Sequence, residues 1–179
     1  MEFITKKLKQ AGIFNTILIV GGMTYDIVRI FSESSVYSTI AVVLQLVAYC
    51  FALNYAFRGY KKDAAKSYKM FLYAFILSMI ATMVSVLIHG KAPMHSTVLS
   101  AIRLICVSIL AFTNDLGKTK SYLFAAITFI VAVISLVWQL SNGVQFGRLY
   151  SFLSALVLSA VLCVFVVAKY SDKESRGAK

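Results

Sequence analysis

Three charged residues lie inside long apolar stretches of this 179-residue chain: Asp26, Arg29 and Arg103. Placing such a residue at the centre of a membrane-spanning helix costs on the order of 2.5–3.5 kcal/mol on insertion scales, so it pairs with another group or serves a function there. A guanidinium group can hold a carboxylate or phosphate through two parallel hydrogen bonds. Two arginines and one aspartate leave a surplus positive charge, which favours an anionic or carboxylate-bearing solute over a cation.

Two arrangements of these charges are open. Asp26 and Arg29 are three residues apart and can pair along one helix, in which case Arg103 needs another anion. Alternatively, an ion pair between Asp26 and Arg103 joins two spans, and Arg29 extends to the lipid headgroups. The first arrangement favours a solute-binding site, and the second favours a structural role.

Three larger polar side chains end or interrupt stripes of small residues. They belong to Gln45, His89 and Gln139. The stripes that end at His89 and Gln139 have the same helical spacing: Ser78, Thr82, Ser85, His89 and Thr128, Ala132, Ser135, Gln139. Helix packing explains the small residues but not the larger ones. We therefore expect Gln45, His89, Arg103 and Gln139 to surround one polar cavity in the outer half of the membrane. The full set of candidate ligand-binding residues is Asp26, Arg29, Gln45, His89, Arg103 and Gln139.

Other site chemistry has no support in the sequence. Cys50, Cys106 and Cys163 form no Cys-x-x-Cys pair, and His89 with His95 makes a poor metal site without a placed carboxylate. The chain has no phosphate-binding loop and none of the common hydrolase motifs. We therefore expect no catalytic residue, no metal and no cofactor, and we do not expect an enzyme.

Six apolar stretches must position these residues, and each is near the ~20 residues that a helix needs to cross the hydrocarbon. Apolar residues make up 60% of the chain, and the mean hydropathy is +0.81. The sequence predicts an all-α polytopic membrane protein with six transmembrane helices in three hairpins. The stretches run over 11–32, 36–57, 70–89, 96–114, 122–141 and 149–168. We expect a single domain over 1–168, with a short amphipathic cytoplasmic segment 1–10 and a flexible basic cytoplasmic tail 169–179.

The distribution of basic residues predicts the orientation. Of the 18 lysines and arginines, 14 lie before the first stretch, after the last stretch, or in loops 58–69 and 115–121. Only Lys91 and Arg148 lie in the alternate loops, so both termini should be cytoplasmic. This bias also accounts for the net charge of +11, and no nucleic-acid partner is expected. We expect an integral protein of the bacterial cytoplasmic membrane.

Residues 1–22 allow a second interpretation, because a basic start and an apolar run also occur in signal peptides. The small-residue cleavage signal is poorly formed, with only Val20-Gly21-Gly22 available. An uncleaved helix is therefore the better interpretation of this segment.

The leading functional hypothesis is binding or transport of a small solute through an outer-half polar pocket, with a partner subunit or as a homo-oligomer. The alternative is an accessory, regulatory or immunity subunit, whose polar stripes only pack helices and contact a partner. The longest loop, 58–69, is too short to hold a soluble catalytic domain. Energy for transport would have to come from a gradient or from a partner.

Overall fold

The computed structural model describes residues 2–32, 36–57, 65–89, 94–113, 116–142 and 146–177. Their side chains are described within 13–31, 36–57, 66–88, 95–113, 116–142 and 152–170.

Six helices make up almost all of the described chain. They are α1 (Glu2–Ser32), α2 (Val36–Phe57), α3 (Ala65–His89), α4 (Met94–Phe112), α5 (Lys118–Ser141) and α6 (Phe146–Gly177). Each of them contains a segment long and apolar enough to cross a membrane. The predicted all-α class and the six candidate spans are therefore confirmed. This composition is typical of an integral membrane protein.

Some helices extend beyond the apolar stretches. α3 begins at Ala65, five residues before the stretch that starts at Met70, and α6 continues to Gly177 through most of the expected tail. Lysine, glutamate and arginine are good helix formers, so a helix can continue past the apolar region into polar surroundings. Hydropathy marks the membrane-crossing part of a helix rather than its ends.

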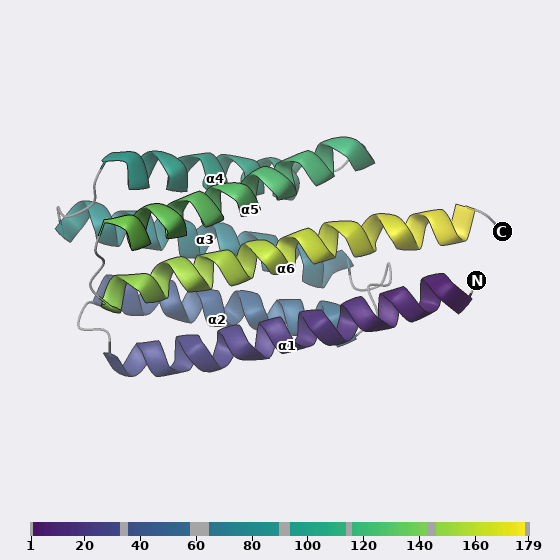
Figure 1. Cartoon of the computed structure of the whole chain (residues 1–179), viewed down its shortest axis with the longest axis horizontal. Helices are drawn as coiled ribbons and strands as arrows, with labels where there is room; N and C mark the ends of the chain where they lie inside the picture. Colours follow the sequence, from purple (N-terminus) through teal and green to yellow (C-terminus); the bar gives the residue numbers. More distant parts are fainter. Residues whose placement is uncertain are drawn as a thin grey trace.

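The helices form a closed ring. Each helix packs against the next one along the chain, and α6 returns to pack against α1. Figure 1 shows that α1 begins and α6 ends at the same end of the bundle. We call this the terminal end, and the opposite end, where α1 ends and α2 begins, the distal end.

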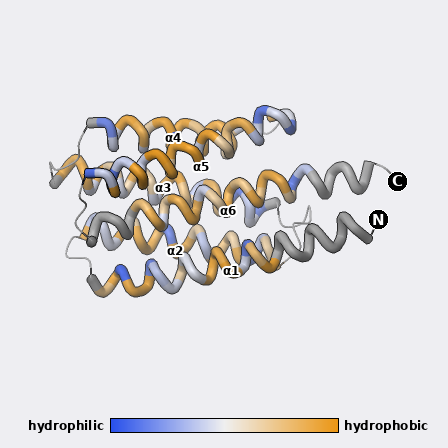
Figure 2. Tube along the Cα trace, viewed as in Figure 1, coloured by the Kyte–Doolittle hydropathy of each residue, from blue (hydrophilic) through white to orange (hydrophobic). Residues whose placement is uncertain are grey.

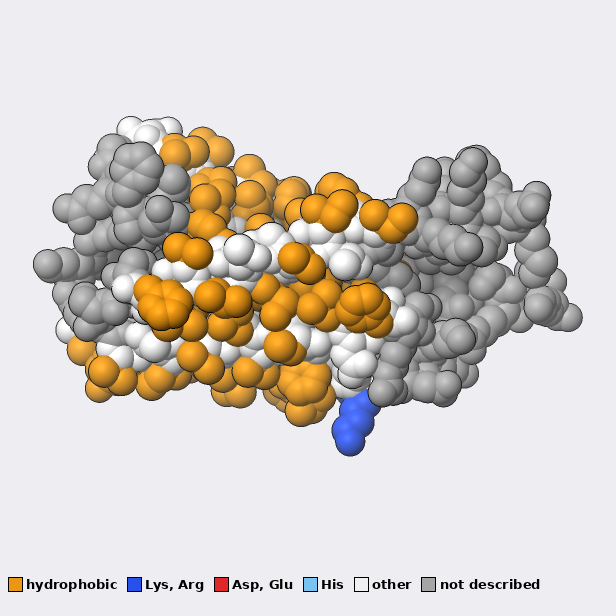
Figure 3. Space-filling model, turned by 90° about the horizontal axis from the view of Figure 1, so that it is seen from below, with side chains coloured by type: hydrophobic (Ala, Val, Ile, Leu, Met, Phe, Trp, Pro, Cys, Tyr) orange, Lys and Arg blue, Asp and Glu red, His pale blue; other side chains and the backbone are white. Residues whose placement is uncertain are grey.

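The outside of the bundle is apolar. Figure 2 shows apolar residues along much of the coloured part of the helices, and Figure 3 shows them spread across the visible face of the bundle. Large apolar side chains such as Ile17, Val28, Leu87 and Ile105 are more than half exposed. In water such a surface would drive aggregation, whereas in a bilayer it contacts lipid.

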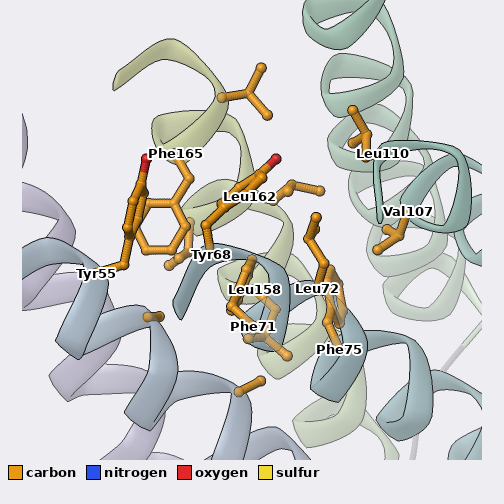
Figure 4. Packing of buried hydrophobic residues seen from close by; sticks show 14 of the residues in the cluster. Tyr55, Tyr68, Phe71, Leu72, Phe75, Val107, Leu110, Leu158, Leu162 and Phe165 are labelled. Carbon is orange, nitrogen blue, oxygen red and sulfur yellow. The ribbon is translucent and has the colours of Figure 1, made fainter. Parts of the chain in front are cut away.

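Aromatic residues fill the interior of the terminal half. The ring of Phe165 from α6 lies 4.8 Å from that of Tyr55 and 5.2 Å from that of Phe71, measured between centroids. Tyr68 packs against both Tyr55 and Phe165. Figure 4 shows these side chains converging from α2, α3 and α6. Such pairs contribute about 0.5–1.5 kcal/mol each beyond their area burial. The terminal half is therefore closed by a packed apolar core.

Candidate functional site

A buried polar cluster joins α1, α2 and α6 in the distal half. The hydroxyl oxygen of Ser154 lies 3.1 Å from Oδ2 of Asp26 and 3.2 Å from Oε1 of Gln45. Asp26 has no exposed surface, and Gln45 and Ser154 are also buried. The Ser154 hydroxyl has one proton, so it donates to only one of the two oxygens at a time. If the Gln45 amide is turned over, its NH₂ group donates to Ser154 instead.

Gly22 and Tyr49 bring α1 and α2 into close contact beside this cluster. A Cβ atom on Gly22 would lie 2.5 Å from the Tyr49 hydroxyl oxygen and 2.6 Å from the ring carbon that carries it. Tyr49 is fully buried. Its hydroxyl group is close enough to Asp26 and Ser154 to interact with them electrostatically, but it makes no well-aligned hydrogen bond. The absence of a side chain at Gly22 is what allows the ring to occupy this position.

Arg29 lies about one turn beyond Asp26 on α1. It is only 6% exposed and interacts electrostatically with Asp26. Residues three apart on a helix are neighbours, so a single helix supplies both charges. The structure thus buries Arg29 beside Asp26, in line with the arrangement in which these two residues pair.

Arg103 reaches across from α4 to another side of α6. Its Nη2 atom donates to the carbonyl oxygen of Ala155 at 3.3 Å and to the hydroxyl oxygen of Ser159 at 3.4 Å. Both distances are long for an N–H···O hydrogen bond. Arg103 is 6% exposed, its buried Nε has no hydrogen-bond partner, and no carboxylate pairs with it within the described part of the chain. This guanidinium group is therefore buried with only weak neutral contacts.

Asp26 and Arg103 lie at similar distances from the distal ends of their helices. Asp26 is six residues before the end of α1, and Arg103 is nine residues after the start of α4. At about 1.5 Å per residue, these positions are roughly 9 Å and 14 Å from the distal ends of their helices. Ser154 is about 12 Å from the start of α6 by the same rise.

The structure brings together some of the predicted site residues. Asp26 and Gln45 meet through Ser154, Arg29 lies beside them, and Arg103 contacts the next residue of α6. Gln139 is partly buried two residues before the end of α5. His89 is the last residue of α3, and its side chain lies outside the described residues.

Sequence reasoning missed the central role of α6. Ser154 was on none of the predicted stripes, and Tyr49 and Gly22 were not assigned to the site. The sequence offered no signal that separates Ser154 from Ser151 and Ser159, the other serines of the 149–168 stretch.

Most stripe hydroxyls on α3 and α5 bond to carbonyl groups of their own helix. Ser78 donates to Phe75, Thr82 to Ser78, Thr128 to Phe124 and Ser135 to Val131, at 2.7–2.8 Å. A contact between helices occurs where the hydroxyl oxygens of Ser38 and Ser85 lie 3.1 Å apart. This pattern is typical of helix packing in membranes. The small-residue stripes therefore do not add chemistry to the site.

The chain matches no protein-family model, no curated protein and no solved structure. Among the described residues, the site consists of a carboxylate with its neighbouring cation and of a second guanidinium group that no carboxylate neutralises.

Proposed function

We propose that this is an integral membrane protein that binds or transports a small anionic or carboxylate-bearing solute, with Arg103 as its main anion-binding residue. The observation that carries the proposal is the burial of Arg103 with long neutral contacts and an unpartnered Nε. A charge within a membrane bundle is costly and marks a functional site by default. A carboxylate that accepts from Nε and one Nη would supply the missing partner.

The charge balance supports a monoanion. Arg29 offsets Asp26, so Arg103 leaves one surplus positive charge in the described distal half. One carboxylate on the solute would neutralise it. Arg103 and Asp26 are enclosed by neighbouring helices, so the distal turns must separate for the solute to enter. Passage to the terminal end would further require the packing around Phe165 to open. A partner subunit, a second copy or an ion gradient would supply the energy.

The distal end faces the outside of a bacterial cytoplasmic membrane in this proposal, and both termini are cytoplasmic. The distribution of basic residues supports this orientation.

Cysteine labelling tests this orientation. In a variant without Cys50, Cys106 and Cys163, a cysteine introduced at Lys91 should react with a membrane-impermeant maleimide added to intact cells. A cysteine at Lys62 should react only after the membrane is opened. Both positions lie outside the described residues, and the sequence predicts that they are in loops. Labelling of position 62 from outside would overturn the orientation.

Arg103→Lys tests the anion-binding role. Small anions, with propionate and inorganic phosphate as probes, should raise the melting temperature of the purified protein in detergent, because a ligand stabilises the state that it binds. We expect Arg103→Lys to weaken this binding at least about tenfold, although the charge is kept, since an ammonium group cannot reproduce the planar fork. Arg103→Gln should weaken it further.

Lys120→Gln is the control for this test, since it removes an exposed cation at the terminal end of α5. It should bind the anions as the unmodified protein does. Equal binding by the unmodified protein and both Arg103 variants would contradict the proposal.

The second candidate is an accessory, regulatory or immunity subunit, and one observation favours it: most of the stripe hydroxyls on α3 and α5 donate to carbonyl groups of their own helices. In that case Arg103 only ties α4 to α6. Its substitution would then lower the melting temperature, and no small anion would raise the melting temperature of any form of the protein.

A further inference from the structure

The terminal end of the bundle carries a large excess of basic residues. The segments that the sequence places there are 1–10, 58–69, 115–121 and 169–179, and they contain 14 lysines and arginines but five acidic residues. In the proposed orientation this end faces the cytoplasmic leaflet, where anionic lipids create a negative surface potential. The charge of this end is therefore complementary to that of the lipid headgroups beside it.

Lys118 and Lys169 lie at the boundaries of two membrane-crossing segments at this end. The segment of α5 begins at Lys118, and the segment of α6 ends at Tyr170, the residue after Lys169. Lysines at such boundaries extend their ammonium groups to the level of the lipid headgroups. The side chain of Lys118 is exposed, and that of Lys169 is half-buried.

Two buried tyrosine rings hold the ammonium group of Lys169 between α3 and α6. Its Nζ atom lies 5.3 Å from the centroid of the Tyr68 ring and 5.7 Å from that of the Tyr170 ring. The Tyr170 hydroxyl group donates to the carbonyl oxygen of Leu116, and its oxygen lies 2.9 Å from the hydroxyl oxygen of Ser121. Packing and hydrogen bonds thus fix the rings that Lys169 contacts.

The second lysine contacts the same group of rings from α5. The Nζ atom of Lys118 lies 5.8 Å from the centroid of the Tyr122 ring, and Tyr122 packs edge-on against Tyr170 with 5.8 Å between centroids. An ammonium group held on a ring face loses less side-chain freedom when it binds an anion. We call Lys118, Lys169 and the rings of Tyr68, Tyr122 and Tyr170 the basic aromatic surface.

We propose that the basic aromatic surface binds the headgroups of anionic phospholipids. The lysines supply the charge, and the tyrosine rings supply the amphipathic contact that is favoured at the headgroup level. Asp115 and Asp172 each lie three residues from one of the lysines, and their side chains are outside the described residues. Both are among the five acidic residues at this end, and the basic excess remains large with them included. The inference does not rest on the proposed function, because Arg103 takes no part in it.

Lipid binding to the full-length protein in a zwitterionic detergent tests the inference. Native mass spectrometry gives the dissociation constants of added phosphatidylglycerol, which is anionic, and phosphatidylcholine, which has no net charge. Phosphatidylglycerol should bind at least about tenfold more tightly, because two lysines act on its charge. Lys118→Gln and Lys169→Gln should each weaken its binding about fivefold, the effect of one basic residue near an anionic surface. Unchanged binding of phosphatidylcholine would show that both variants are folded.

Lys120→Gln is the matched control. Lys120 is exposed and lies two residues after Lys118 on α5, so it is about 200° further around the helix. Its substitution changes the net charge by the same amount. We expect it to weaken phosphatidylglycerol binding less than about twofold, because solvent and salt screen a charge on another side of the helix.

Three results would overturn the inference. The first is equal binding of the two lipids by the unmodified protein. The second is an equal loss in all three lysine variants, which would mean that only the net charge of this end matters. The third is displacement of phosphatidylglycerol by inorganic phosphate that binds as tightly at the same two lysines, which would identify a site for a soluble anion. Small anions that bind at Arg103 should do so equally well in the lysine variants, so the proposed function can fail or stand separately.

Discussion

Asp26→Ala is expected to destabilise the protein by on the order of 3–5 kcal/mol, the cost of removing one partner from a buried charged pair. Arg29 would remain buried beside an apolar methyl group, and Ser154 would lose one of its two acceptors. The free energy of unfolding can be measured in mixed detergent micelles, with helix loss followed by circular dichroism.

Thr24→Ala is the matched control for this change. Thr24 is exposed on the same helix and donates only to the carbonyl of Val20, one turn earlier. We expect its substitution to change stability by less than about 0.5 kcal/mol. If Asp26→Ala proves as stable as Thr24→Ala, the cluster around Ser154 contributes nothing to stability.

Gly22→Ala is expected to cost about 1–3 kcal/mol, the usual penalty for overpacking a filled interior. The new Cβ would meet the end of the Tyr49 ring, and that side chain is fully buried. The same unfolding measurement applies.

Its neighbour Gly21 provides the control, because a Cβ there meets nothing within 4 Å. Gly21→Ala should stabilise the helix slightly, by roughly 0.5–1 kcal/mol, since alanine loses less backbone freedom than glycine. The two adjacent substitutions should therefore have opposite signs. If both are neutral, α1 and α2 do not approach as closely as the structure has them.

The sequence by itself determined the number and type of elements. Six apolar stretches of near-uniform length predict six spans, because the thickness of the hydrocarbon sets a local requirement on each helix separately. It also singled out Asp26, Arg29 and Arg103, since a charge within such a stretch is visible without any knowledge of its neighbours.

Only the tertiary structure decided which groups meet. Arg103 contacts Ala155 and Ser159, and Asp26 contacts Ser154, so α6 carries both halves of the site. These contacts depend on how far each helix is rotated about its own axis, and packing against all its neighbours sets that rotation. Ser154 was therefore indistinguishable from other small residues of α6, whereas the charged residues were recognisable from composition alone. Helix ends such as Ala65 and Gly177 were also not predicted. Hydropathy indicates where the membrane-crossing segment ends, and a helix can continue beyond that point.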